Sequence, residues 1–221
     1  AKLLHIANSA YYNPSGAAIR GLPEAITRLG VNLVRTTALA VAMNQLMRSR
    51  EMAAFSELTR DLWQHSIKTA AAARILARTH TRVPPDEAML AGLVHDLGAF
   101  YMLYRAMQYA ELRARPESMR YLIMQWHESI GVTLLNALGL PTEIVDATID
   151  HDQPRPLPTT LRTLADVVYV ANLLTCEDFD WLYPESASAS GPGEIALART
   201  AYGEIISQMD ADAREMMVVF S

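Results

Sequence analysis

The sequence has a single cysteine, Cys176, so the chain cannot form an internal disulfide. Proteins that carry free thiols are typical of reducing compartments, which favours a cytoplasmic protein. No apolar run reaches the roughly 20 residues that a membrane-crossing helix requires. No basic segment followed by an apolar one opens the chain, as it does in a secretory leader. We therefore expect neither a disulfide-stabilised scaffold nor a membrane protein.

Basic residues are too few and too scattered for a nucleic-acid-binding surface. The chain has 24 acidic and 19 basic residues and a formal net charge of -5. No dense stripe of lysine and arginine is present that would neutralise a phosphate backbone, so nucleic acid is not an expected partner. Apolar residues, in contrast, are abundant: they make up 51% of the 221 residues, which is enough for a sizeable core.

Apolar residues recur at three- and four-residue steps along most of the chain, which is the spacing of helices and not of strands. Gly30 weakens the second of the expected helices, so two shorter helices that meet at this residue are an alternative. The last helix is expected to be interrupted or bent near Asp210. The pattern predicts an all-α fold with helices over residues 3–7, 22–34, 36–47, 55–77, 87–97, 100–112, 118–138, 142–149, 159–174 and 194–219.

Proline, glycine and serine suggest how the chain is divided. Residues 1–184 are expected to form one helical domain, and residues 185–193, rich in Ser, Ala, Gly and Pro, a flexible link. Residues 194–221 then form a C-terminal helical segment that packs on the domain. The first residues have the composition of a helix interior, so we expect the natural protein to extend beyond this N-terminus.

Histidines and aspartates recur every few helical turns through the middle of the chain. Imidazole and carboxylate groups are ligands of iron, manganese, nickel and zinc, and helical bundles bring such side chains together around a buried ion. The same residues could instead be buried polar groups that only satisfy one another by hydrogen bonds. His5 and His80 are isolated and are left out of the predicted site. The candidate metal ligands are His65, His95, Asp96, His127, His151, Asp152 and Asp166.

The doublet His95-Asp96 places a condition on this site. Neighbouring side chains on a helix diverge by about 100 degrees, so both can contact one ion only near a helix end or between helices. Gly98 follows two residues later and is well placed for a left-handed helix end. We therefore expect the doublet at the end of a helix.

The run Gly92-Leu93-Val94-His95-Asp96-Leu97-Gly98 resembles the central signature of the HD superfamily. In that superfamily an upstream histidine, the His-Asp doublet and a later aspartate bind metal. His65 matches the upstream histidine and Asp166 the late aspartate. The resemblance is most specific to HDOD domains, the HD-related output domains of bacterial signalling proteins, and it extends from residue 3 to about residue 174. The segments that carry it are 3–12, 25–30, 127–131, 139–141 and 149–152.

This resemblance implies a single multi-helix HD-like bundle with an N-terminal helical subregion. It also implies a regulatory output module, whose partner is a signalling protein, a fused signalling domain or a second copy of the chain. The sequence departs from the related HD-GYP phosphodiesterases for cyclic di-GMP at three places. Ala99 replaces a lysine that could hold substrate phosphate, Asp152 replaces a histidine, and residues 153–156 replace the Gly-Tyr-Pro loop.

Two hypotheses follow from these observations. The first is a non-catalytic regulatory module, which has no catalytic residues and holds a divalent transition metal, if any, without turnover. The second is a metal-dependent phosphohydrolase or cyclic-dinucleotide phosphodiesterase. In it His65, His95, Asp96 and Asp166 hold one metal, His127 and His151, with or without Asp152, hold another, and the metals activate a bridging water. Because only Arg155 and Lys68 could stabilise a departing phosphate, the first hypothesis is favoured.

Overall fold

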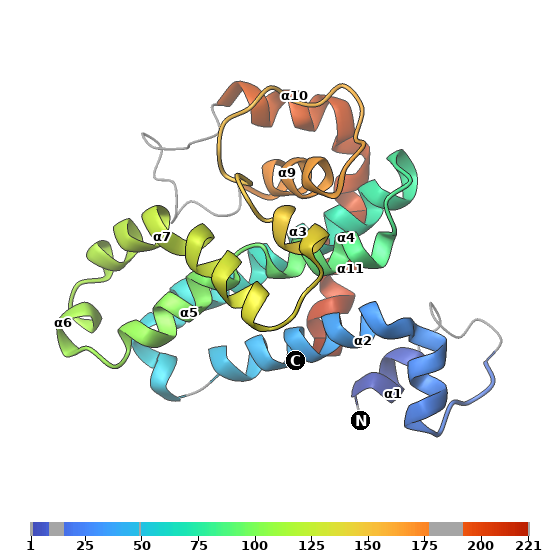
Figure 1. Cartoon of the computed structure of the whole chain (residues 1–221), viewed down its shortest axis with the longest axis horizontal. Coiled ribbons are helices and arrows are strands. Elements are labelled where there is room, and N and C mark those ends of the chain that lie inside the picture. Colours follow the sequence, from blue (N-terminus) through green and yellow to red (C-terminus); the bar gives the residue numbers. More distant parts are fainter. Residues whose placement is uncertain (1, 9–15, 49, 177–191, 221) are drawn as a thin grey trace.

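The described part of the chain folds mainly into helices (Figure 1). The computed structural model describes residues 2–8, 16–48, 50–176 and 192–220, and these residues include no strand. The predicted all-α fold is confirmed. The helices in chain order are α1 Lys2–Ala7, α2 Leu22–Met47, η1 Arg50–Phe55, α3 Ser56–His80, α4 Pro85–Val94, α5 Leu97–Ala106, α6 Ala110–Arg113, α7 Pro116–Ala137, α8 Thr142–Asp146, α9 Leu164–Thr175, α10 Pro192–Tyr202, η3 Gly203–Ile205 and α11 Ile206–Phe220.

Helix α3 runs through the core and positions the site. It packs against α4, α9 and α11 (Figure 1), and its alanines 70–73 are fully buried. Small side chains let helix backbones approach one another, and the pair α3 and α4 shows how closely. A Cβ atom on Gly92 of α4 would lie only 2.8 Å from the carbonyl oxygen of Thr69. Such close packing holds His65 of α3 and His95 after α4 at a fixed separation.

Helix α2 is bent at Gly30, as the weak point in the sequence suggested. This glycine has φ 75° and ψ 162°, which no helix accommodates, so α2 consists of two helical halves that meet there. The first half packs on α1. The side chain of Asn8 also fixes this region, since its Nδ2 donates to the carbonyl oxygen of Ile19 at 2.8 Å and its Oδ1 accepts from the Ile19 amide at 2.7 Å. These contacts define the predicted N-terminal subregion.

Gly98 does not end a helix, and that prediction is wrong. Helix α4 ends at Val94, and Gly98 lies in the first turn of α5 without a positive φ. The absence of a side chain at Gly98 allows a close backbone contact between α5 and α7. A Cβ atom on Gly98 would overlap the carbonyl oxygen of His127 and lie 2.6 Å from the amide nitrogen of Gly131. Helices α5 and α7 therefore cross with their backbones in contact.

Residues 153–158 are not helical, as their prolines predicted, but α8 ends at Asp146 and not at Ile149, because the chain passes into turns at residue 147. Tyr169 of α9 fastens residues 153–158, because its hydroxyl donates to the carbonyl oxygen of Arg155 at 2.7 Å and accepts from the Arg155 amide at 3.2 Å. Helix α9 begins at Leu164 and not near residue 159. Thr163 and Asp166 form a reciprocal capping box that sets this start.

The C-terminal segment bends at a different residue from the one predicted. The predicted link 185–193 lies outside the described residues except for residues 192 and 193, which open α10. The interruption between α10 and α11 is the short helix η3, and the glycine that begins it, Gly203, explains the break better than Asp210. Helix α10 packs on α9, and α11 packs on α3. Across the described residues, no helix combines the length and apolarity needed to cross a membrane.

Candidate metal centre

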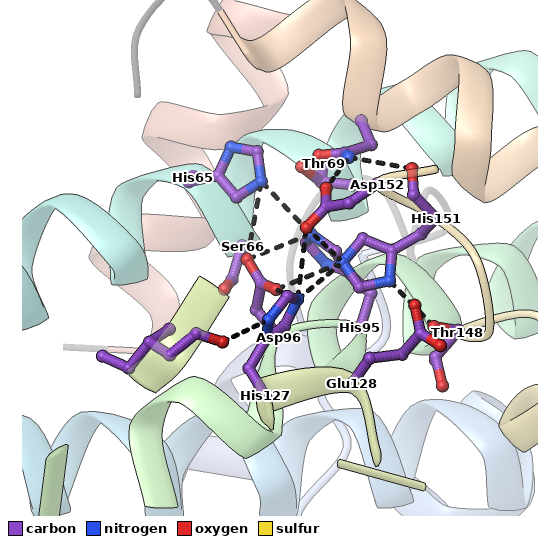
Figure 2. A network of polar contacts seen from close by, with 12 residues as sticks. His65, Ser66, Thr69, His95, Asp96, His127, Glu128, Thr148, His151 and Asp152 are labelled. Carbon is purple, nitrogen blue, oxygen red and sulfur yellow. Dashed lines mark hydrogen bonds and ion pairs between the residues drawn. The ribbon is translucent and has the colours of Figure 1, made fainter. Parts of the chain in front are cut away.

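Six of the seven predicted metal ligands lie together in one pocket (Figure 2). They come from parts of the chain that are far apart in sequence, and none is more than 8% exposed. They are His65 in α3, His95 at the end of α4, Asp96 directly before α5, His127 in α7, and His151 and Asp152 in the turns after α8. The doublet thus lies between two helices, which meets the condition that adjacent ligands impose.

Three of the histidine rings are aimed by bonds within their own helical turn. The Nδ1 atoms of His95, His127 and His151 donate to the carbonyl oxygens of Gly92, Ile123 and Thr148, at 2.8, 2.7 and 2.8 Å. A carbonyl oxygen only accepts, so each Nδ1 carries a hydrogen. In the neutral ring the lone pair then resides on Nε2, which faces the pocket. This is the arrangement that metal-binding histidines use.

The Nε2 atoms of the four histidines meet around Asp96. The Nε2 atoms of His65 and His95 are 3.1 Å apart, and those of His127 and His151 are 3.4 Å apart. Asp96 Oδ2 lies 3.7 and 3.3 Å from the first two nitrogens, and Asp96 Oδ1 lies 3.5 and 3.3 Å from the second two. One carboxylate therefore joins two pairs of imidazoles.

The turn that carries His151 is held against α7. Asp150 has a φ of 57°, which an aspartate tolerates better than most residues, and its amide donates to Glu128 Oε2 at 3.0 Å. Glu128 directly follows His127 on α7 (Figure 2). The contact thereby brings His151 and Asp152 to the His127 ring, where Asp152 Oδ2 lies 3.2 Å from His127 Nε2 and 3.4 Å from His151 Nε2.

The donor set could hold a divalent transition metal. Two overlapping groups offer ligand atoms within 4.8 Å of one another, namely Asp96, His127, His151 and Asp152 in the first and His65, His95 and Asp96 in the second. Asp96 Oδ1 and Asp152 Oδ2 are buried and lie 3.2–3.5 Å from the Nε2 atoms of His127 and His151. A buried carboxylate is costly unless a cation, either a metal ion or a protonated imidazole, neutralises it. Mixed nitrogen and oxygen donors of this kind suit iron, manganese, nickel or zinc.

Asp166, the seventh candidate, is not brought into the pocket. Its Oδ2 accepts hydrogen bonds from the amides of Arg162 and Thr163, at 3.1 and 3.0 Å, and its Oδ1 lies 3.8 Å from Arg155. Burial works to raise the pKa of Asp166, but these backbone hydrogen bonds outweigh it and lower the pKa. The carboxylate stabilises the N-terminus of α9 and points toward the helix start instead of the pocket.

The residue of α9 that reaches the pocket is Asn172, which the sequence analysis missed. Asn172 is 2% exposed, and its Nδ2 donates to Asp152 Oδ1 at 2.8 Å and to the carbonyl oxygen of His151 at 3.2 Å. One signal was available in the sequence. A polar residue inside the apolar run 167–174 needs a buried partner, and Ala171-Asn172 repeats the local pattern of Ala165-Asp166.

The comparison with protein families decides the identity. The profile of the HDOD domain matches residues 1–154, which is well over half of the chain. The chain belongs to the HDOD family. A search of curated proteins finds no match.

Solved structures resemble this HDOD chain in fold. A provisionally named metal-dependent phosphohydrolase from Shewanella amazonensis SB2B is 23% identical with a TM-score of 0.71, over 100% of this chain and 79% of that one. A provisionally named signal transduction protein from Marinobacter aquaeolei VT8 is 20% identical with a TM-score of 0.59, over 99% of this chain and 51% of that one. An HDOD domain protein of unknown function from Geobacter sulfurreducens is 20% identical with a TM-score of 0.53, over 97% and 80%.

Without a metal, the HDOD pocket separates its histidines into two kinds. Burial alone would lower the pKa of His151, but the carboxylates of Asp152 and Asp96 outweigh it and raise this pKa to about 10. The pKa of His127 is raised in the same way, against burial, chiefly by Asp152. Burial dominates for the other two rings: it lowers the pKa of His95 to about 4 and also lowers the pKa of His65.

The two carboxylates remain ionised in this state. Burial works to raise the pKa of Asp96, yet the histidines around it, His95 first, hold that pKa well below its usual range. Asp152 behaves alike, because His151 and His127 outweigh burial and lower its pKa. At neutral pH the metal-free pocket thus contains two imidazolium groups and two carboxylates, so its charges balance.

These shifts predict how stability depends on pH in the metal-free HDOD chain. The raised pKa values of His127 and His151 contribute stability that is present below the ordinary histidine pKa of about 6.5 and is lost as the pH rises toward about 10. The lowered pKa values of His65 and His95 act oppositely, so stability is lost as the pH falls from about 6.5 toward about 4. We expect the free energy of unfolding to be greatest near pH 6.5.

Urea titrations of chelator-treated protein at about pH 5, 6.5 and 9 measure this dependence. The double variant His127→Gln, His151→Gln is the control, and its free energy of unfolding should change much less between about pH 6.5 and 9. A wild-type free energy of unfolding that rises steadily over the alkaline interval would contradict the assignment of protonated His127 and His151.

Proposed function

We propose that this HDOD chain is a non-catalytic module of bacterial signal transduction. In this proposal the pocket holds a divalent transition metal as part of the core, and the module acts through contacts with a signalling protein, a fused signalling domain or a second copy of the chain. The observation that carries the proposal is that, within the part of the chain that the structure describes, the ion pairs of the two buried carboxylates are all made with histidines. The module is expected in the cytoplasm.

The surroundings of the two carboxylates support this view. Each ion pair of Asp96 and Asp152 among the described residues is made with a histidine. Arg155, the basic residue nearest in sequence to Asp152, is engaged elsewhere. Its guanidinium lies 4.3 Å from the centre of the Tyr169 ring and donates to the carbonyl oxygen of Ala165 at 3.0 Å. Transfer of a phosphoryl group needs positive charge where the departing oxygen develops its own charge, and these arginine contacts do not supply it.

The burial of the site supports the same view. None of its six residues is more than 8% exposed. A role for the ion in structure requires no opening to solvent. Bound in the pocket, it would join α7 and the turns after α4 and α8 through its ligands.

Exposed aromatic side chains on α7 support the proposed contacts with a partner. Helix α7 exposes two large aromatic side chains, Tyr121 at 66% and Trp126 at 50%. Aromatic residues with one polar end are enriched in protein interfaces. The same helix carries His127 into the pocket, so a partner bound to α7 would contact the element that holds one of the ligands.

The alternative function is a metal-dependent phosphohydrolase or cyclic-dinucleotide phosphodiesterase. It is favoured by the convergence of four imidazoles and two carboxylates, and by the provisional name of the relative from Shewanella amazonensis. A divalent ion there would supply a water of lowered pKa as the nucleophile. The chain's own residues would have to bind and orient the phosphate, and the arginine contacts described above argue against it.

Turnover assays separate the two functions. We expect purified protein, loaded with manganese or ferrous ion, to hydrolyse neither cyclic dinucleotides nor bis(p-nitrophenyl) phosphate at a rate that changes in the His95→Ala variant. His80→Ala is the matched control, since His80 lies at the end of α3 beside Glu204 and outside the pocket. Hydrolysis that is lost in His95→Ala and kept in His80→Ala would overturn the non-catalytic proposal. Elemental analysis of the same preparations measures occupancy separately.

A further inference from the structure

The pocket contains more neutral ligands than acidic ones. Four imidazoles converge there, but the two groups of ligands share only two carboxylates, Asp96 and Asp152. One divalent ion would be neutralised by these two carboxylates. A second divalent ion would leave two positive charges uncompensated in a pocket whose residues are at most 8% exposed. Uncompensated charge in such surroundings is strongly unfavourable.

The two groups of ligands also differ from each other. Asp96, His127, His151 and Asp152 provide four ligands with both carboxylates, which is enough for a tetrahedral ion. His65, His95 and Asp96 provide three ligands, and the one carboxylate is shared with the other group. The first group is complete by itself, whereas the second lacks both a fourth ligand and a negative charge of its own.

Asn172 occupies the position from which that missing charge could come. It is 2% exposed, and its side chain interacts with the His65 ring in addition to its bonds to Asp152 Oδ1 and the carbonyl oxygen of His151. Its amide nitrogen faces Asp152, so its oxygen is directed away from these two acceptors. The side chain therefore spans both groups of ligands, yet it is neutral and adds no carboxylate.

Resting on the proposed function, we infer that the pocket binds one divalent ion, in the group of Asp96, His127, His151 and Asp152, and that Asn172 sets this limit. Asn172 acts as a positioning residue. By donating to Asp152 Oδ1 at 2.8 Å it leaves Asp152 Oδ2, which is 3.2 Å from His127 Nε2, free to accept the ion. Its neutral side chain leaves the half that contains His65 and His95 without charge for a second ion.

The number of bound ions tests this inference directly. Purified protein is stripped with chelator, loaded with manganese alone, and analysed by elemental analysis and titration calorimetry. We expect one ion per wild-type chain and two per chain in Asn172→Asp. Asn136→Asp is the matched control, because it makes the same change at an exposed residue of α7 and should keep one ion. One ion in both wild type and Asn172→Asp would refute the role of Asn172.

Two histidine variants locate the ion independently of Asn172. His151→Ala should lose the ion, with at least a tenfold weaker affinity, whereas His65→Ala should retain one ion with affinity close to that of wild type. The opposite pattern overturns the inference, and this pair decides the matter if Asn172→Asp does not fold. Two ions in wild type would refute the inference but preserve the metal centre. No ion in wild type would instead refute the metal centre on which the inference rests.

Discussion

Replacing Asp96 by asparagine is expected to abolish metal binding and to destabilise the metal-free protein by about 3–5 kcal/mol, the usual cost of removing one partner from a buried ion pair. Asp96 lies within 3.7 Å of the Nε2 atoms of all four histidines. Without its charge, the protonated rings of His127 and His151 have Asp152 as their remaining carboxylate. The free energy of unfolding in urea and the bound metal content are the two measurements.

Asp146→Asn is the control for this experiment. Asp146 ends the short helix α8, is exposed, and loses the same charge on substitution. Its free energy of unfolding should stay within about 0.5 kcal/mol of wild type, as for most surface substitutions. If Asp96→Asn were as stable as Asp146→Asn and retained its ion, the pocket would not be the electrostatic centre described above.

A single methyl group at Gly98 is expected to have an effect of similar size. The Cβ atom of Gly98→Ala would overlap the carbonyl oxygen of His127 and approach the amide of Gly131 to 2.6 Å. Both atoms are backbone, so no rotamer change relieves the contact and α7 must move away from α5. We expect a loss of about 3–5 kcal/mol, beyond the usual range for overpacking. Metal affinity should fall as well, since His127 moves with α7.

Gly203→Ala is the matched control, because a Cβ atom at Gly203 has no neighbour within 4 Å and its φ is not positive. Thermal unfolding and manganese titration of both variants test the prediction. A Gly98→Ala protein with wild-type stability and affinity would show that α5 and α7 are not held in the close contact described.

The fold was largely predictable because its determinants are local. Apolar spacing identified every long helix, and the glycine at position 30 marked the bend of α2. Helix ends were less predictable. The prediction for Gly98 rested on its distance from the doublet alone. The feature that requires a glycine there is the backbone of α7, which lies about 30 residues further along the chain. A contact of this kind leaves no signal in the neighbouring residues.

The pocket residues were also predictable only where their determinants are local. Residue type and family pattern identified the six residues that converge, because histidine and aspartate are uncommon inside apolar helices. Residue type and family pattern did not identify the residue of α9 that reaches the pocket, because Asp166 and Asn172 have similar neighbours in the sequence. Which of the two faces the pocket depends on where the helix starts, and the capping box at Thr163 starts it about five residues later than apolar spacing indicated.

The hydrogen bonds that orient three of the histidine rings link ion binding to the positions of the helices. His95, His127 and His151 each donate to a carbonyl three or four residues earlier, so every ring takes its direction from its own segment. Assembly of the pocket then depends only on how those segments are docked. A shift of α7 along α5 would carry the His127 ring away intact, and ion affinity would report that displacement as a change in occupancy.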